Sequence, residues 1–263
     1  MSETFLEKIV AKMLDKVARQ KRGADIEALR CRAVEVRSAA DPHRLQEALS
    51  RKDRTNIIAE IKRASPSKGV INANIDVSQL ARQYELGGAA AISVLTENEY
   101  FGGLLDDLRA VRATVDLPIL RKDFIVDEFQ IFEAAAAGAD AVLLIVAALT
   151  EENLKNFLRL VHDELQMDAL VEVHTREELE TAGLIGANIV GINNRDLHSL
   201  DVLLDVSRRL IEYRPDNALI VTESGISSRD EIDELRQLGF DGFLIGETLM
   251  RTSDAEQTLG AWI

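Results

Sequence analysis

The chain has 263 residues, of which 46% are hydrophobic and 29% are charged, which is ordinary for a folded globular protein. Its formal net charge of -14 argues against nucleic acids and anionic membranes as partners, because both repel an acidic surface. No apolar run approaches the ~20 residues of a membrane span, and the first residues are too charged for a signal peptide. The single cysteine, Cys31, cannot form an internal disulfide. We therefore expect a cytoplasmic protein.

The first 50 residues predict a helical extension that precedes the rest of the fold. Thr4 and Glu7 form a capping-box pattern at the start of its first helix. Apolar residues then recur at helical spacing and indicate a docking face: Phe5, Ile9, Met13 and Val17. A second helix is expected from Ala24 to Ala39, and Asp41-Pro42 opens a third.

From Asn56 onward, short aliphatic runs alternate with charged helical patterns. The expected strands are Asn56–Ile61, Ala90–Leu95, Pro118–Arg121, Ala141–Val146, Ala169–Val173, Ile189–Ile192, Leu219–Thr222 and Gly242–Ile245. The expected helices are Ser78–Leu86, Asp106–Thr114, Glu128–Ala137, Glu151–Glu164, Thr175–Ala182, Leu200–Glu212 and Ser228–Leu238. Strands with crossover helices imply a parallel sheet of the α/β class, and eight of them favour a closed (β/α)8 TIM barrel over an open doubly wound sheet. Since no linker marks a boundary, residues 1–263 should form one domain, with 1–50 as its N-terminal helical extension.

Polar residues gather where these strands end, and that end of a barrel carries the active site. Glu60 and Lys62 lie two residues apart, which is the period of a strand, so both point to the same face. The other strand ends contribute Arg121, Lys122, Asp123, Glu172, Asn193, Asn194, Arg195, Glu223 and Ser224. Each alone has a structural explanation, such as a solvated lysine, an ion-paired carboxylate or a turn asparagine. Charges gathered in one barrel mouth are costly unless paired or used, so together they predict a functional pocket.

The loops after the last two strands indicate a phosphate site. The segments "ESGIS" and "LIGETLM" place Gly225 and Gly246 where backbone N–H groups can approach an anion. In barrels, a short helix after the eighth strand often binds phosphate through its N-terminus. Gly246 and Glu247 would open that helix, with the Glu247 carboxylate directed away from the anion. The residues alone therefore predict acid–base chemistry on an anionic sugar phosphate.

The segment "IIAEIKRASPSKGVI" resembles the signature of the indole-3-glycerol phosphate synthase family. The likeness continues in family order through "AISVLTENEYF", "ILRKDFIVDEFQI", "GADAVLLIVAAL", "LVEVH", "VGINNRDL", "TESGI" and "GFLIGE". The resemblance implies a (β/α)8 barrel whose N-terminal helices partly cover the active site. It implies a carboxy-lyase of tryptophan biosynthesis that uses no cofactor or metal. Its substrate would be 1-(2-carboxyphenylamino)-1-deoxy-D-ribulose 5-phosphate, which closes its ring with loss of carbon dioxide and then dehydrates to indole-3-glycerol phosphate.

The resemblance also implies a role for each matching residue. Lys122 looks like the general acid, with Lys62 holding the substrate's negative charge, and Glu172 looks like the general base for dehydration. The full catalytic set would be Glu60, Lys62, Lys122, Glu172, Asn193, Glu223 and Ser224. The substrate-binding set would be Ser65, Phe124, Leu143, Arg195, Leu197, Gly225, Ile245, Gly246 and Glu247. Within this second set, the apolar residues would hold the aromatic ring, and the residues of the last two loops would hold the phosphate together with Ser224.

Two properties of individual side chains are expected as well. Lys62 close to Lys122 should depress the pKa of Lys122, with Glu60 opposing this effect. His174 is expected to stand behind the catalytic residues or on the surface. Two other classes of function stay open: another sugar-phosphate enzyme, such as an isomerase or a Schiff-base aldolase using Lys122, and a catalytically silent barrel in a multi-enzyme complex. We expect a monomer.

Overall fold

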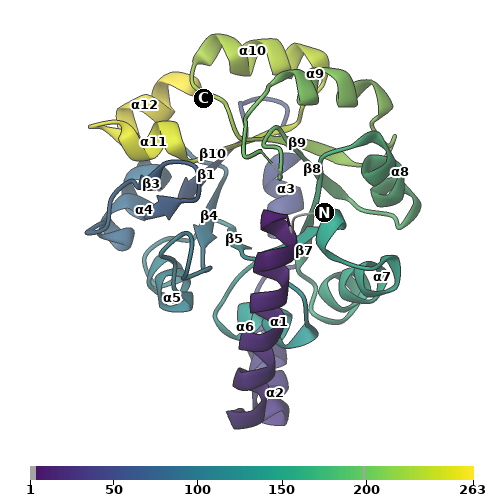
Figure 1. The fold of residues 1–263 in the computed structure, drawn as a ribbon. Coiled ribbons are helices and arrows are strands. Elements are labelled where there is room, and N and C mark those ends of the chain that lie inside the picture. Colours follow the sequence, from purple (N-terminus) through teal and green to yellow (C-terminus); the bar gives the residue numbers. More distant parts are fainter. Residues whose placement is uncertain (1–3, 198) are drawn as a thin grey trace.

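The computed structural model describes residues 4–197 and 199–263, so residues 1–3 of the predicted extension lie outside the described part. Eight parallel strands close into a barrel in the order β1-β10-β9-β8-β7-β6-β5-β4 (Figure 1). These strands are β1 (Ile57–Ile61), β4 (Ala91–Leu95), β5 (Ile119–Lys122), β6 (Ala141–Ile145), β7 (Asp168–Val173), β8 (Ile189–Asn193), β9 (Leu219–Glu223) and β10 (Gly242–Ile245). Each predicted strand is confirmed to within one residue at either end, and the barrel excludes the open sheet.

Helices surround the barrel, as expected for crossover connections. They are α4 (Val77–Leu86), α5 (Leu105–Arg112), α6 (Glu128–Ala136), α7 (Glu151–Arg159), α8 (Arg176–Leu184), α9 (Asp205–Leu210), α10 (Arg229–Leu238), α11 (Glu247–Arg251) and α12 (Ala255–Trp262). A π-helical turn (Leu160–Glu164) follows α7, a 3-10 turn follows β6 (Val146–Ala148) and another follows α9 (Ile211–Tyr213). The loop after β1 contains a small hairpin of β2 (Ala64–Ser65) and β3 (Gly69–Val70).

One predicted helix is wrong over its first third. The pattern predicts a helix from Leu200, whereas α9 begins at Asp205. Leu200 has a φ of +64°, which a helix cannot contain, and its carbonyl accepts a hydrogen bond from Arg195 Nη1 at 3.0 Å. Arg195 also forms a β-bridge with Val202. Tertiary contacts of this loop with the barrel mouth therefore override its local helical pattern.

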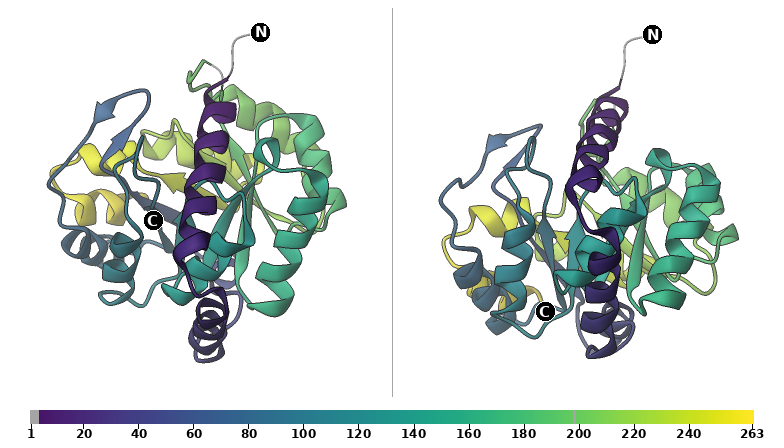
Figure 2. Two further views of the ribbon diagram at one scale, coloured as in Figure 1. Left: turned by 60° about the horizontal axis from the view of Figure 1, so that its bottom comes forward. Right: turned by 90° about the horizontal axis from the view of Figure 1, so that it is seen from below.

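The N-terminal extension consists of α1 (Phe5–Gly23), α2 (Ile26–Ser38) and α3 (Arg44–Leu49), and it reaches both ends of the barrel. In Figure 1, α1 passes in front of the barrel and α3 lies behind it, and Figure 2 shows the same extension from two further sides. The predicted capping box is confirmed, because Glu7 N–H donates to Thr4 Oγ1 at 3.1 Å and Thr4 N–H donates to Glu7 Oε2 at 2.7 Å. Met13 and Val17 of α1 pack against Val126 and Phe129, which lie at the start of α6.

The third helix closes the amino end of the barrel. Leu45 and Leu49 of α3 are fully buried among interior side chains such as Ile58, Leu120 and Leu170. This helix starts later than Asp41-Pro42 predicts, because His43 adopts a left-handed backbone (φ +50°) immediately before Arg44. Within the described residues, no helix has the length and apolar character needed to cross a membrane.

Candidate active site

A cavity of about 590 Å³ opens at the carboxyl ends of the strands. All the side chains predicted for catalysis and substrate binding line it: Glu60, Lys62, Ser65, Lys122, Phe124, Leu143, Glu172, Asn193, Arg195, Leu197, Glu223, Ser224, Gly225, Ile245, Gly246 and Glu247. Residues up to 187 positions apart in the chain, from Glu60 to Glu247, thus share one space because parallel strands all end at the same rim.

Lys122, the last residue of β5, lies at the centre of the polar group. Its Nζ is 2.9 Å from Glu172 Oε2 on β7 and 3.2 Å from Glu223 Oε2 on β9. Burial alone would lower the pKa of Lys122, but the carboxylates of Glu172, Glu223 and Glu60 outweigh burial and raise it well above its ordinary value. The predicted depression of this pKa was therefore wrong. Lys122 is held as an ammonium ion.

Lys62 does not depress the pKa of Lys122, because the charge of Lys62 is paired with that of Glu60. Lys62 Nζ lies 2.5 Å from Glu60 Oε1, and both side chains are largely shielded from solvent. The predicted same-face geometry of these two residues is thus confirmed. Gly246 lies against this pair, since a Cβ at that position would overlap the Glu60 carboxylate. The glycine is required by the close approach of Glu60, in addition to any role beside a phosphate.

The two carboxylates bound to Lys122 differ in protonation. Burial raises the pKa of Glu172, but the charges of Lys122 and His174 outweigh burial and hold it well below its usual range. Burial also raises the pKa of Glu223, and repulsion from Glu172 raises it further. The charge of Lys122 lowers it, but the pKa of Glu223 still reaches about 7. Glu223 Oε1 is buried without a hydrogen-bond partner among the described residues, and a Cβ at Gly191 would overlap it. One ammonium therefore holds one ionised carboxylate and one that exchanges a proton near neutrality.

His174 stands directly behind Glu172. Its Nε2 lies 3.4 Å from Glu172 Oε1, and its Nδ1 lies 3.3 Å from Glu178 Oε2 on α8. Burial opposes the charged imidazolium, but Glu172 and Glu178 outweigh burial and raise the pKa of His174 to about 10. Of the two expectations for this residue, the contact with a predicted catalytic residue is the one observed. The adjacent "VEVH" spacing is the signal that identifies it.

Arg195 connects two loops across the rim. Its backbone N–H donates to Asn193 Oδ1 at 3.0 Å, which fixes the Asn193 side chain at the end of β8. Its guanidinium Nη1 donates to Ser67 Oγ at 2.9 Å, in the loop after β1. Asn194, in contrast, does not line the cavity: its amide donates to Thr222 Oγ1 at 3.0 Å and ties β8 to β9.

The predicted phosphate end of the cavity has a tightly constrained backbone. Ser224 and Gly225 both have positive φ, at +67° and +89°, and a Cβ at Gly225 would overlap Val202. Glu247 opens α11, and its Oε1 pairs with Arg251 Nε at 3.1 Å. Several further side chains that were not predicted for the site from the sequence also line the cavity: Phe5, Ser67, Phe101, Ser227, Thr248 and Arg251. Phe5 was predicted only as part of a helical stripe, and its place in the lining agrees with the implied covering of the active site by the N-terminal helices.

Residues 6–261 match the family model described as "Indole-3-glycerol phosphate synthase". The chain belongs to this family. A relative of that name from Carboxydothermus hydrogenoformans is 46% identical over 259 residues, covering 97% of this chain and 98% of that protein. Another from Lachnoclostridium phytofermentans is 44% identical over 260 residues, covering 95% of each. The resemblance seen in the sequence is therefore confirmed over nearly the whole chain.

Solved structures outside the family share only the fold. A thiamine phosphate pyrophosphorylase from Pyrococcus furiosus has a TM-score of 0.60 at 19% identity, covering 83% of this chain and 95% of that one. A 3-hexulose-6-phosphate synthase from Salmonella typhimurium has a TM-score of 0.62 at 12% identity, covering 79% and 96%. At such identities the likeness supports the barrel architecture of the synthase and nothing about its chemistry.

Proposed function

We propose that this chain is an indole-3-glycerol phosphate synthase in which Lys122 is the general acid. The substrate would be 1-(2-carboxyphenylamino)-1-deoxy-D-ribulose 5-phosphate. Its ring carbon that bears the carboxylate attacks the ribulose carbonyl, carbon dioxide leaves, and loss of water gives the indole. The observation that carries the proposal is the Lys122 ammonium, held between two carboxylates at 2.9 and 3.2 Å inside a deep, partly apolar cavity.

The raised pKa keeps Lys122 positively charged for the first step, although it also makes the ammonium a weaker acid. Lys122 is fully protonated at neutral pH, so it can donate to the carbonyl oxygen as negative charge develops there. The same ammonium can then assist the departure of the hydroxyl group as water. A neutral lysine could do neither. The ion pairs with Glu172 and Glu223 therefore favour the reaction, because they keep Lys122 protonated.

Glu172 would accept the proton that is lost during dehydration. In the free protein its pKa is low, chiefly because the Lys122 charge outweighs the effect of burial. When Lys122 gives up its proton, this stabilising charge disappears, and the basicity of the buried Glu172 rises. The base thus becomes strong only after the acid has acted. Glu223, with a pKa of about 7, would bind a substrate hydroxyl and exchange protons with the pair.

The remaining walls would bind the two ends of the substrate. Phe124, Leu143, Leu197 and Ile245 would hold the aromatic ring, and Phe101 adds to this wall with its ring 6.4 Å from that of Phe124. Ser224, Gly225, Gly246 and Glu247 would hold the phosphate, with the nearby Arg251 cation also facing the cavity. Lys62 and Arg195 would balance the carboxylate, and Glu60, Asn193 and Ser65 would bind hydroxyl groups.

We further propose that the enzyme works in the cytoplasm as a single-domain monomer. Among the described residues, the large exposed apolar side chains are spread over different elements, such as Leu14 on α1, Leu86 on α4, Leu184 on α8 and Leu238 on α10, and exposed apolar side chains are normal on monomers. Light scattering coupled to gel filtration would test this, and a mass of twice 29.1 kDa would contradict it.

The function is tested by adding the substrate to purified protein and following indole fluorescence. Indole should form, and Glu172→Gln should abolish most of the turnover while leaving substrate binding intact. Borohydride added with substrate should not trap a covalent adduct on Lys122, since no Schiff base is involved. Trapping would favour the aldolase alternative. Substrate binding without product by the unmodified protein would favour the silent barrel.

A further inference from the structure

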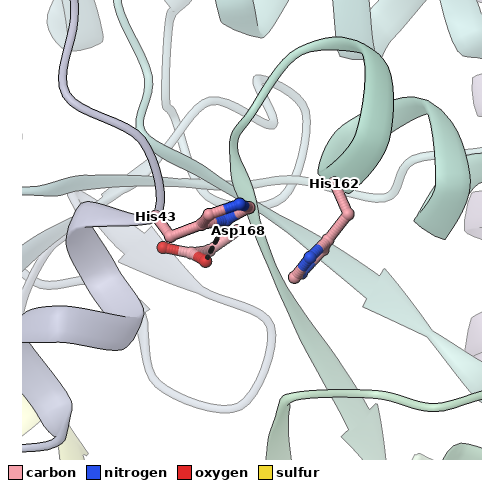
Figure 3. Close-up of side chains that lie close together, drawn as sticks. All are labelled: His43, His162 and Asp168. Carbon is pink, nitrogen blue, oxygen red and sulfur yellow. Dashed lines mark hydrogen bonds and ion pairs between the residues drawn. The ribbon is translucent and has the colours of Figure 1, made fainter.

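A second cluster of titratable side chains lies at the opposite end of the barrel from the cavity. It consists of His43, which precedes α3, His162 in the π-helical turn after α7, and Asp168, the first residue of β7 (Figure 3). Asp168 and Glu172 belong to the same strand, four residues apart, which corresponds to about 13 Å of extended chain. The cluster is therefore separate from the reaction.

The three side chains face one shared space. His43 Nδ1 lies 3.2 Å from Asp168 Oδ1, and the rings of His43 and His162 lie face to face with centroids 4.9 Å apart and planes at 29°. One nitrogen or oxygen from each residue can be chosen so that all three lie within 4.8 Å of one another. Figure 3 shows them converging from the loop before α3, the turn after α7 and the start of β7.

Helix capping accounts for only part of this arrangement. Asp168 Oδ2 accepts a hydrogen bond from the backbone N–H of Gln46 at 3.0 Å, which caps the first turn of α3. Its other oxygen, Asp168 Oδ1, contacts His43 Nδ1 at 3.2 Å. Capping does not explain why His162 Nε2 is buried with no hydrogen-bond partner in the described part of the chain. An unpartnered, buried imidazole nitrogen next to a second imidazole and a buried carboxylate is the donor set of a metal site.

Burial shifts the pKa values of two of the three side chains, and it raises that of Asp168. Burial and the neighbouring His43 lower the pKa of His162, which favours the neutral imidazole that binds metals. Asn188 Nδ2 lies 3.5 Å from His162 Nδ1, and the same amide nitrogen donates to Gln46 Oε1 at 3.3 Å.

We propose that His43, His162 and Asp168 bind one transition-metal dication of the Zn²⁺ class, with water as a fourth ligand. Two imidazole nitrogens and one carboxylate oxygen suit Zn²⁺, Co²⁺ or Ni²⁺ better than Ca²⁺ or Mg²⁺, which prefer oxygen ligands. Tetrahedral Zn²⁺ with bonds of 2.0–2.2 Å separates its ligands by roughly 3.4 Å. Because imidazole lone pairs lie in the ring plane, the two stacked rings must draw together by about 1 Å and also rotate toward a common point. The His43 side chain is 34% exposed and lies on a loop, which permits this shift.

The site would join three segments that are distant in sequence. The metal would fix the loop before α3 to the turn after α7 and to the first residue of β7. Because α3 carries Leu45 and Leu49 into the barrel interior, metal binding should stabilise the closed amino end without entering the chemistry at the mouth.

The test uses the full-length protein without a histidine tag, freed of metal by chelation. Titration with Co²⁺ should give the visible absorption of a tetrahedral site at one equivalent, and Zn²⁺ should displace it. Zn²⁺ should also raise the melting temperature. His43→Gln and His162→Ala should each weaken Co²⁺ binding at least 100-fold. His174→Gln replaces a histidine at the other end of the barrel and should leave Co²⁺ binding unchanged.

Two kinds of result would overturn the proposed metal site. Folded wild-type protein that gives neither the cobalt absorption nor a Zn²⁺-dependent rise in melting temperature would overturn the proposal. Binding that persists in both His43→Gln and His162→Ala, or that is lost in His174→Gln, would place the metal elsewhere and overturn it too. If His162→Ala does not fold, His43→Gln decides alone, because His43 is the more exposed ligand. None of these outcomes depends on the enzymatic activity, so the proposed function is tested separately.

Discussion

The two ends of the barrel are formed by the same eight strands, but the barrel interior is polar at one end and apolar at the other. At the carboxyl ends, Lys122 is buried among Glu172, Glu223 and Glu60 around a cavity. At the amino ends, Leu45 and Leu49 of α3 fill the interior. Buried charges at the first end are costly to folding and useful to chemistry, whereas the apolar plug at the second contributes stability only. Substitutions at the carboxyl ends of the strands should therefore lower activity, and substitutions in the apolar interior at the amino ends should lower stability.

The largest effect is expected for Lys122→Met at the mouth. It removes the proposed acid and leaves Glu172 and Glu223 as buried carboxylates without their cation. Turnover should fall by about 10²–10⁴-fold or more, as for loss of a general acid. Steady-state measurement of indole formation checks this. Lys155→Met, which removes a surface partner of Glu151 on α7, is the control and should retain wild-type kinetics. Turnover of Lys122→Met within tenfold of wild type would sink the assignment.

Leu45→Ala at the opposite end should have the converse result. Truncating a fully buried side chain leaves a cavity and should lower the free energy of unfolding by about 2–5 kcal/mol. The turnover number should stay unchanged at temperatures where the variant is folded. Urea unfolding and indole formation measured on the same samples decide this. Leu184→Ala, at a position 87% exposed, is the matched control and should change stability by less than ~0.5 kcal/mol.

A glycine substitution at the mouth can be compared with one on an outer helix. Gly246→Ala would press a methyl group into the Glu60 carboxylate, costing about 1–3 kcal/mol of stability and displacing the Glu60–Lys62 pair. Gly260→Ala on α12 meets no atom within 4 Å and should stabilise the helix by up to about 1 kcal/mol. Urea unfolding measures both changes, and activity should fall only for Gly246→Ala. Equal effects of the two would contradict the close approach at Gly246.

The smallest expected effect concerns His174 and depends on pH. Its pKa rises from 6.5 to about 10 on folding, so its contribution to stability is fully present below pH 6.5 and is lost as the pH rises through 10. His174→Gln should therefore lower the free energy of unfolding by about 1 kcal/mol at pH 6 and by less at pH 9. Urea unfolding at both pH values measures the difference. A deficit that grows with pH would mean that His174 is neutral in the folded protein.

Much of this architecture could be predicted from the sequence. Each strand appears as a short aliphatic run because a parallel strand buried on both faces needs apolar side chains at every position. The mouth residues could be grouped in advance, since strand ends of a parallel barrel meet at one rim. Local patterns failed where distant contacts decide, as in the loop that holds Leu200 in a left-handed conformation through Arg195.

By itself, the sequence determined the barrel, the helical extension, the family and the set of side chains around the cavity, because periodicity and motif order are local properties. Only the tertiary structure decided their electrostatic states. The pKa of Lys122 is raised because Glu172 and Glu223, distant in the chain, lie 2.9 and 3.2 Å from its Nζ, while Lys62 is paired with Glu60. Tertiary structure alone also brought His43, His162 and Asp168 together. Charge interactions depend on distances in space, and those are fixed only when the barrel closes.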